Sequence, residues 1–291
     1  MHHHHHHMSV SVLGLGPMGQ ALTRALLNAN HRTTVWNRTA AKADDVVARG
    51  AVWADDPASA IAAGDLTLVN VVDQQAVDAV LTAAGDAVAG RVIIGLSAGT
   101  PDAARRTASF VTGAGGAYLD GAIMTPTDTI GTASASVLFS GPRELFDDHR
   151  EVLSALGTLT WLGEDVGRAE AFDVALLDLF WTSVSGFVHA LSIAKANGVS
   201  AVELLPHANG ISEILPAIFT EIAERVESGR HDDASAPVSS VAASLRNLIS
   251  AARSAGIDAG ALETFRDYVD AAVAAGHGDA EISRITPLGI G

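Results

Sequence analysis

The sequence predicts an α/β N-terminal domain, a long connecting helix and an all-helical C-terminal domain. Short apolar runs alternate with alanine-rich amphipathic stretches up to about Trp161, an uninterrupted apolar segment follows, and further helical patterns fill the rest. The chain opens with MHHHHHHM, which is typical of an expression tag followed by a native start. We therefore expect the tag at residues 1–8 and three structural parts at residues 9–165, 166–197 and 198–291.

Composition narrows the class of protein. The 291 residues are 48% hydrophobic and 18% charged, which indicates a globular chain with large cores. A net charge of -15 makes a nucleic-acid or anionic-membrane partner improbable. Cysteine is absent, which excludes disulfides, thiolate zinc sites and cysteine nucleophiles, and we expect no metal. Charges interrupt every apolar run, so we expect no membrane span and a cytoplasmic location.

The elements follow from the apolar pattern. Between the predicted strands, Ala40–Arg49 and Gln75–Ala83 are amphipathic and predict helices, so the pattern indicates βαβ units and a mostly parallel sheet. The predicted strands are Ser9–Leu13, Thr33–Trp36, Leu66–Val71, Val92–Leu96 and Ser136–Phe139.

The segment from Gly167 to about Asn197 predicts the long helix, because it has no proline and one internal glycine, Gly186. It is apolar on nearly all sides, and we expect a second subunit to help bury it. Further helices are predicted at Ile211–Glu227, Ser239–Ala255 and Ala261–Ala275, with a polar loop at Ser228–Pro237.

Three glycines mark the first strand-to-helix turn, in the stretch VSVLGLGPMGQ. The spacing GxGxxG in this context predicts a Rossmann-type dinucleotide-binding domain. The first glycine allows the tight turn, the second lets a pyrophosphate approach the backbone, and the third permits close helix packing. The alternative is a structural turn without a ligand. The expected contacts are Gly14, Leu15, Gly16, Pro17, Met18 and Gly19.

The residues that follow the second predicted strand indicate whether the cofactor is NAD or NADPH. An acidic residue there would favour NAD, but this chain has Asn37, Arg38 and Thr39, with Lys42 one turn further on. These groups attract a 2′-phosphate, so the sequence predicts NADPH. The alternative, a solvated basic helix start, is disfavoured by the helix dipole. We also expect cofactor contacts from Val71, Val72, Ser97 and Ala98.

Several short motifs occur in order from residue 10 to about 278: GLGPMG, WNRT, GTP at 99–101, GAIMTP, FDVALL and AAGHG at 274–278. Together they resemble the imine reductases and reductive aminases of the β-hydroxyacid dehydrogenase superfamily. Acid-oxidising members of that superfamily carry a Ser-Gly-Gly turn and a lysine near the start of the long helix. Here the corresponding positions hold LDGAIMTPTDTIGT at 119–132 and Asp173.

The resemblance implies NADPH-dependent reduction of C=N bonds in small imines, or in carbonyl and amine pairs. It also implies a homodimer with interlocked helical domains and an active site between domains of two subunits. Two alternatives remain open: a β-hydroxyacid-type or small-carbonyl dehydrogenase, and an NADPH-binding regulatory protein without turnover.

Asp173 is the predicted catalytic residue. A carboxylate beside a nicotinamide repels an acid substrate and attracts a cationic iminium, and burial raises a carboxyl pKa so that it can deliver a proton. Whether Asp173 donates the proton or anchors the cation stays open. The alternative is an exposed aspartate near a helix start. Asp178 lies about 140° round the helix and is expected at the surface or a dimer contact.

The substrate pocket is predicted mainly from the resemblance, which places Trp181 in the lining; the alternative is a core tryptophan. Ala98 stands where many relatives have an amide, which favours reduction of a ready-made imine over ketone-plus-amine coupling. His189 is expected to be a core or interface histidine. Weaker pocket candidates are Met124, Thr125, Leu177, Phe180 and, from the partner subunit, Ile214 and Phe219.

Overall fold

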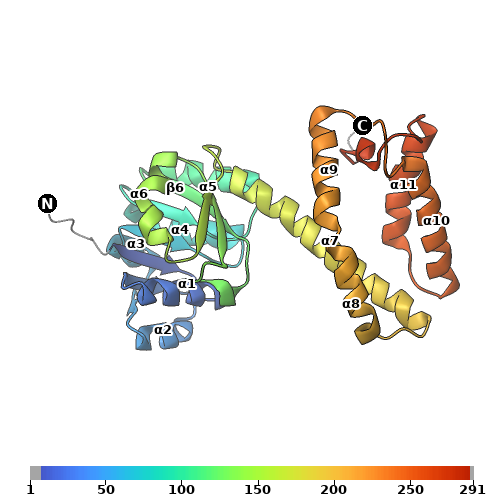
Figure 1. Cartoon of the computed structure of the whole chain (residues 1–291). Helices are drawn as coiled ribbons and strands as arrows, with labels where there is room; N and C mark the ends of the chain where they lie inside the picture. Colours follow the sequence, from blue (N-terminus) through green and yellow to red (C-terminus); the bar gives the residue numbers. More distant parts are fainter. Residues whose placement is uncertain (1–7, 289–291) are drawn as a thin grey trace. The chain divides into compact units, whose positions relative to one another are not determined.

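The computed structural model describes residues 8–288, so the expected tag lies outside the described residues except for Met8. The chain divides into two compact units, and the division falls within one helix, between Leu179 and Phe180. Figure 1 shows the ribbon coloured along the sequence. Each unit is described by itself below.

The first unit is built on an eight-stranded sheet in the order β3-β2-β1-β4-β5-β6-β7-β8. All neighbouring strands are parallel except β6 and β7, which are antiparallel. The first six positions have the dinucleotide-binding strand order, in which the chain reverses direction across the sheet between β1 and β4. The strands are β1 (Ser9–Leu13), β2 (Arg32–Trp36), β3 (Val52–Trp53), β4 (Leu66–Val69), β5 (Val92–Gly95), β6 (Ala117–Ile123), β7 (Ser136–Ser140) and β8 (Thr158–Trp161).

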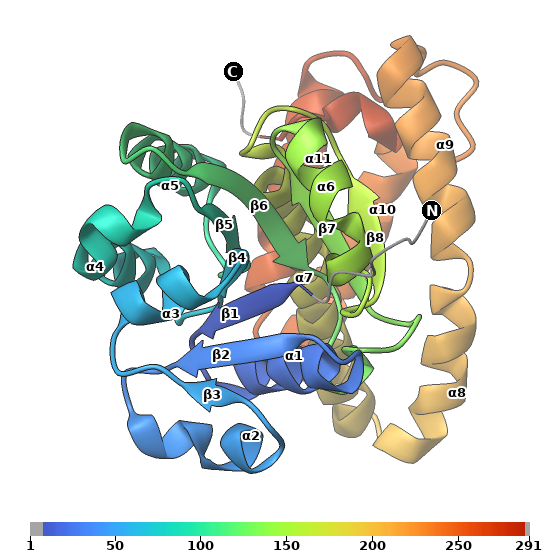
Figure 2. The ribbon, with the colours of Figure 1, turned by 90° about the vertical axis from the view of Figure 1, so that its left-hand side faces the viewer.

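Helices cover both faces of this sheet (Figure 2). One buried cluster joins the sheet to α1, α2 and α6 through side chains such as Leu22, Val46 and Phe146. The other joins it to α3, α4 and α5 through Ile61 and Leu81, among others. The helices are α1 (Pro17–Asn28), α2 (Asp44–Ala48), α3 (Pro57–Ala63), α4 (Gln74–Ala84), α5 (Pro101–Gly113) and α6 (Arg143–Leu153).

The predicted α/β class is confirmed, and each of the five predicted strands is present within two residues of its expected ends. Three strands were not predicted. β3 has only two residues, β8 is short, and β6 carries Asp120 and Gly121, which are rare in strands. The predicted helix at Ala40–Arg49 is a 3₁₀ turn (Ala40–Ala43) followed by α2.

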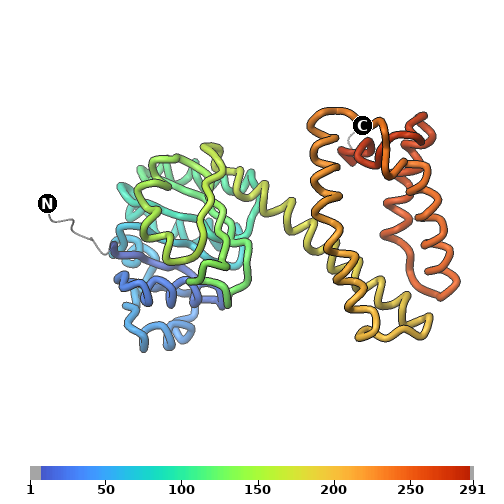
Figure 3. The backbone as a smooth tube through the Cα atoms, viewed as in Figure 1, coloured from blue at the N-terminus to red at the C-terminus, as the bar shows by residue number. Residues whose placement is uncertain are grey.

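The second unit is helical, as predicted, and Figure 3 traces its backbone. Its small core packs α10 against α11 through Val238, Ala242, Leu245 and Val269. α7 (Arg168–Ala196) begins in the first unit and ends in the second, and the helices that follow it are α8 (Ala201–Ser212), α9 (Leu215–Ser228), α10 (Val238–Ser254) and α11 (Gly260–Ala274).

Helix α8 was not predicted, and the predicted helix at Ile211–Glu227 begins too early. Pro206 lies inside α8 and hid its pattern, while Pro216 stands in the first turn of α9 and fixes its start. A capping box between Ser200 and Glu203 begins α8. The break between the two helices falls at Glu213 and Ile214, so Ile211 belongs to α8.

Helix α7 matches the predicted long helix, but within a single chain it is not buried. Trp181 is 62% exposed and Val188 is 57% exposed. By length and composition alone α7 could cross a membrane. The expectation that charges interrupt every apolar run is therefore wrong for this helix, because no Asp, Glu, Lys or Arg lies between Asp178 and Lys195.

Candidate active site

The glycine turn between β1 and α1 has the shape that the sequence predicts. Gly14 has φ +106°, and a Cβ there would lie 1.8 Å from the Asn70 carbonyl oxygen. A Cβ on Gly19 would lie 1.9 Å from the Gly14 carbonyl oxygen, so this glycine permits the helix to pack closely. Gly16 is exposed, and a Cβ there would meet nothing within 4 Å. Gly14 and Gly19 are needed by the fold, whereas Gly16 leaves an open approach to the helix N-terminus.

Asn37 joins this turn to the end of β2. The Leu15 amide donates a hydrogen bond of 2.8 Å to Asn37 Oδ1, and Asn37 Nδ2 donates one of 3.0 Å to the Thr39 carbonyl. Arg38, Thr39 and Lys42 are exposed beside it. Within residues 8–288, neither Arg38 nor Lys42 enters an ion pair, so both cations are free to bind an anion. These residues fit a phosphorylated dinucleotide.

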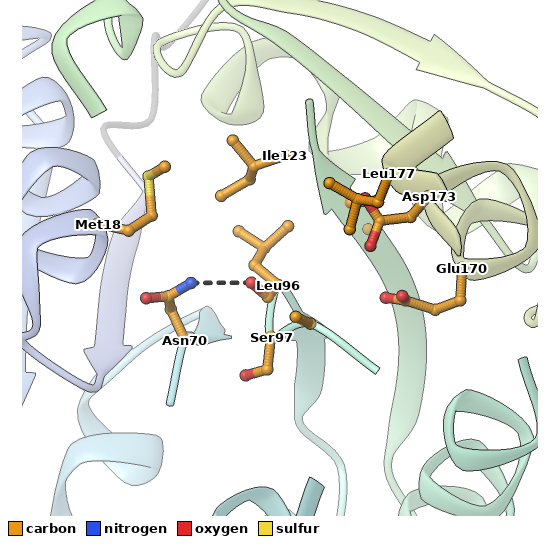
Figure 4. Close-up of a pocket in the computed structure, with 11 residues that line it drawn as sticks. Met18, Asn70, Leu96, Ser97, Ile123, Glu170, Asp173 and Leu177 are labelled. Atoms are coloured by element: carbon orange, nitrogen blue, oxygen red, sulfur yellow. Dashed lines mark hydrogen bonds between the residues drawn. The ribbon is translucent and has the colours of Figure 1, made fainter. Parts of the chain in front are cut away.

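The ends of β4 and β5 are tied together beside the turn. Asn70 Nδ2 donates a hydrogen bond of 2.8 Å to the Leu96 carbonyl (Figure 4). Ser97 Oγ donates to the Val69 carbonyl at 3.1 Å and accepts from the Val71 amide at 3.0 Å. The predicted cofactor contacts at Val71, Ser97 and the neighbouring Ala98 therefore lie at the carboxyl edge of the sheet, where ligands bind in this architecture.

A cavity of about 200 Å³ opens between this edge and the first turns of α7. Figure 4 shows Glu170 and Asp173 extending from α7 toward it, with Met18 and Asn70 on the other side. Its walls mix apolar side chains with a few polar groups, as small-molecule sites do. The lining residues are Met18, Asn70, Leu96, Ser97, Ala98, Gly121, Ala122, Ile123, Glu170, Asp173 and Leu177.

The start of α7 is held in place by polar contacts of the first unit. Ser140 Oγ donates to the Val166 carbonyl and accepts from the Ala169 amide, each at 2.8 Å. Arg105 on α5 makes a two-pronged contact with Asp165, at 3.2 and 3.0 Å. These contacts fix the position of the first helical turns and hence of the carboxyl groups that they carry.

Asp173 is 7% exposed. Burial raises the pKa of its carboxyl above the ordinary value. No ion pair involves Asp173 in the part of the chain that the structure describes. The carboxyl group therefore faces a cavity without a neutralising cation, which suits it to give up a proton or to attract a cationic ligand.

Glu170 stands three residues before Asp173, on the same side of α7, and is 2% exposed. Burial raises the pKa of Glu170 to about 7, and the nearby Asp173 carboxylate adds to the rise. Hydrogen bonds from Asp120 and from the Gly99 amide act in the opposite direction. Glu170 is thus a second acid of the cavity, poised near neutral pH.

Asp120 of β6 lies behind Glu170 and is 3% exposed. Burial and the Glu170 charge raise the pKa of Asp120 well above its ordinary value, against a hydrogen bond from Tyr118. That bond joins the Tyr118 hydroxyl to Asp120 Oδ1 at 2.7 Å. Gly95 makes room for it, because a Cβ there would lie 2.0 Å from the Tyr118 hydroxyl.

The structure gathers only part of the predicted site. Met18, Ser97, Ala98, Asp173 and Leu177 line the cavity. Met124 and Thr125 follow β6 but are not among the lining residues, and the Thr125 hydroxyl accepts from Thr129 at 2.8 Å. Val72 is 85% exposed.

The other predicted pocket residues belong to the second unit. Phe180 and Trp181 form an edge-to-face pair with ring centroids 5.1 Å apart, and both are exposed. Ile214 and Phe219 are exposed near the start of α9. Asp178 is exposed on α7, and His189 Nε2 lies 2.6 Å from the Asp258 carbonyl oxygen.

Sequence reasoning missed Asn70, Glu170, Asp120 and Tyr118. Each of these residues had a spacing or position in the sequence that could have identified it. Glu170 and Asp173 have the i, i+3 spacing that places side chains on one helix face. Tyr118 and Asp120 have the period of two that places side chains on one strand face. Asn70 is a polar residue at the end of an apolar strand.

The fold and this site define a class: an oxidoreductase that uses a dinucleotide, with an acidic cavity beside the expected nicotinamide end. The NAD binding domain of 6-phosphogluconate dehydrogenase matches residues 9–163. The NADPH-dependent reductive aminase-like C-terminal domain matches residues 165–288.

Comparison with known proteins narrows the class. The chain is 32% identical to an NADPH-dependent reductive aminase of Aspergillus oryzae, over 95% of each chain. It is similar to the imine reductase of Myxococcus stipitatus in complex with NADP+, with TM-score 0.91 and 32% identity over 96% of this chain and 98% of the other. It is also similar to the reductive aminase of Aspergillus terreus in complex with NADPH4, cyclohexanone and allyl amine, with TM-score 0.90 and 33% identity over the same shares. The chain belongs to the imine reductase and reductive aminase family.

Proposed function

We propose that this protein reduces imines to amines with NADPH, and that Asp173 is the residue that protonates or anchors the substrate nitrogen. The observation that carries the proposal is a buried carboxyl group without a cation, facing a cavity at the carboxyl edge of a dinucleotide-binding sheet. The enzyme is an NADPH-dependent oxidoreductase acting on C=N bonds.

The cofactor is NADPH, which supplies a hydride when bound. The turn from Gly14 to Gly19 would hold its pyrophosphate, and Arg38, Thr39 and Lys42 would hold its 2′-phosphate. Ser97 and Ala98 would lie beside the nicotinamide, together with the backbone at Val71 and Val72. Gly16 leaves the approach to the helix N-terminus open, which supports this placement of the pyrophosphate.

Asp173 then acts on the nitrogen of the substrate. When its carboxyl is protonated it donates the proton, and the carboxylate that remains stabilises the iminium. The iminium carbon is more electrophilic than that of the neutral imine, so hydride addition to it is faster. An acid substrate would place a second anion beside Asp173, Glu170 and Asp120, which disfavours the β-hydroxyacid alternative.

We further propose that the protein is a soluble, cytoplasmic homodimer with interlocked helical domains. The apolar side chains exposed on α7, α8 and α9 support this proposal, because a single chain leaves them uncovered. In such a dimer, Phe180 and Trp181 would complete the substrate pocket together with Ile214 and Phe219 of the partner subunit. The substrates are small imines or pairs of carbonyl compound and amine, and Ala98 favours ready-made imines.

The test compares wild type with Asp173→Ala, using the cyclic imine 2-methyl-1-pyrroline and the loss of NADPH absorbance. We expect wild-type turnover and a fall in kcat of at least about a hundredfold in the variant, because a general acid contributes about that much. NADPH affinity should be unchanged. Asp178→Ala is the matched control, since Asp178 is an exposed aspartate on the same helix, and it should keep full activity.

Two results would count against the proposal. Full activity of Asp173→Ala would remove the assigned role and keep the reaction. Wild-type protein that binds NADPH but turns over no imine or carbonyl compound would favour the regulatory alternative.

A further inference from the structure

Further buried groups that can lose a proton lie behind Asp173. From the cavity inward, the order is Asp173, Glu170, Asp120 and Tyr118, and each is at most 7% exposed. Glu170 lines the main cavity together with Asp173. It also lines a second recess of about 10 Å³ together with Asp120 and Tyr118. Glu170 and Ser97 therefore border both spaces, and of the two only Glu170 carries an acid.

Asp120 and Glu170 require a proton between them. A side-chain hydrogen bond between the two carboxyl groups contributes to the pKa of each. Asp120 Oδ2 and Glu170 Oε2 are both buried and receive no N–H or O–H donor from any other described residue. Two ionised carboxylates in this arrangement would repel each other in a medium of low dielectric constant. A single shared proton satisfies both orphaned oxygens.

No cation offsets these charges among residues 8–288. The titratable groups that face Glu170 are Asp120 and Tyr118 from β6 and Asp173 from α7. Two arginines near the start of α7 are engaged elsewhere: Arg105 pairs with Asp165 and Asp102, and Arg168 donates to the Leu162 carbonyl. The pair is thus a proton store rather than half of a salt bridge.

We propose that the Asp120 and Glu170 pair stores a proton and that Glu170 returns it to Asp173 after each turnover. The proposal rests on the proposed function. It makes Glu170 a proton-supplying residue that acts through Asp173. Tyr118 and Asp120 orient Glu170, and Asp120 shares the stored proton with it. Gly95 leaves room for the hydrogen bond between Tyr118 and Asp120.

The protons given up and taken up balance over one catalytic cycle. The Asp173 carboxyl gives its proton to the imine nitrogen, and the hydride adds to the carbon. The Asp173 carboxylate then takes the proton of the Glu170 carboxyl. The pair is refilled by one proton from solvent through the small recess, which is bordered by the exposed Thr100 and is of the size of a water molecule. One solvent proton is consumed for each imine reduced.

A substrate that needs no proton distinguishes proton supply by Glu170 from an effect of Glu170 on packing. We would compare a weakly basic cyclic N-aryl imine with its N-methyl iminium salt at pH about 6.5, where the pair still holds its proton, the first substrate is mostly unprotonated and the second is always cationic. The variant is Glu170→Gln, which keeps the shape and loses the acid. Glu144→Gln, an exposed glutamate on α6, is the matched control.

We expect Glu170→Gln to slow the neutral imine by about tenfold or more and to reduce the N-methyl iminium at close to the wild-type rate. For the neutral imine, wild-type kcat should fall as pH rises through about 7, and this break should vanish in the variant. Tyr118→Phe should move the break to higher pH, because without the hydrogen bond from Tyr118 the pair holds the shared proton more tightly.

Equal loss on both substrates would overturn the proposal, since packing or cofactor placement affects both. An unchanged rate and pH profile in Glu170→Gln would overturn it as well. Wild-type protein inactive on both substrates would instead contradict the proposed function, and the proposal with it.

Discussion

At the start of α7, two carboxylic acids lie in surroundings that penalise their charge. Glu170 and Asp173 are three residues apart on one helix face and are both buried. Helix dipoles stabilise acidic residues in a first turn, but here burial dominates and raises both pKa values. Residues placed at such a cost to stability are typical of functional sites.

This cost predicts a pH dependence of stability. Burial raises the pKa of Glu170 from 4.5 to about 7, so the folded protein binds more protons than the unfolded chain between these values. The free energy of unfolding therefore falls as pH rises through this window. Glu170→Gln removes the titration, so the melting temperature of wild type should fall more from pH about 5 to about 8 than that of the variant.

The measurement is thermal unfolding of both proteins at the two pH values, with Glu144→Gln as the control. Parallel losses in wild type and Glu170→Gln would show that Glu170 does not carry this pH dependence.

At the scale of elements, the turn between β1 and α1 separates two kinds of glycine. Gly14 and Gly19 are required by contacts inside the protein, whereas Gly16 has free space around its Cα. Gly16 has φ -65°, which any residue can adopt. The fold itself does not require glycine here, and we propose that the pyrophosphate of a bound dinucleotide does.

Gly16→Val tests this distinction. We expect an unchanged melting temperature and an NADPH dissociation constant at least about tenfold higher, because the side chain would occupy the approach to the helix N-terminus. Gly113→Val, at another glycine with open surroundings, is the control for the added side chain. Calorimetric titration with NADPH gives the result, and an unchanged affinity in Gly16→Val would place the pyrophosphate elsewhere.

Helices and strands with a clear apolar or glycine pattern could be predicted from the sequence. The apolar strands β1, β4 and β5 and the glycine turn follow from composition and spacing alone. β6 could not, because Asp120 and Gly121 interrupt its apolar pattern, yet Gly121 lines the cavity and Asp120 lines the recess beside it. α8 was missed because Pro206 lies within it.

The candidate site could be predicted only where a motif marked it. Asp173 and the cofactor residues follow from motifs, whereas the grouping of Tyr118, Asp120 and Glu170 depends on β5, β6 and α7 coming together. No local sequence pattern predicts that β5, β6 and α7 meet.

At the scale of the whole molecule, the exposed apolar face of the helical unit is the feature that a single chain leaves unexplained. By composition α7 could enter a bilayer or a protein interface. We favour a second copy of the chain as its cover, as proposed above, because apolar side chains of α7, α8 and α9 stay exposed in a single chain.

Val188→Asp tests the homodimer. Val188 is 57% exposed on α7, and a buried unpaired charge in an interface costs several kcal/mol, so we expect the variant to be mostly monomeric at micromolar concentration. Val52→Asp, which changes a valine of the same exposure on β3, should stay dimeric. Sedimentation velocity distinguishes the two, and a monomeric wild type would contradict the dimer.

The central claim is that hydride passes from NADPH to the carbon of a C=N bond. The most direct measurement offers the enzyme NADPH deuterated at the transferred position, with 2-methyl-1-pyrroline, a small aldehyde and a β-keto acid together, and analyses the products by mass spectrometry. The account predicts 2-methylpyrrolidine with one deuterium at the former imine carbon and little labelled alcohol. Label found in the alcohol or hydroxy acid, with no deuterated amine, would contradict it.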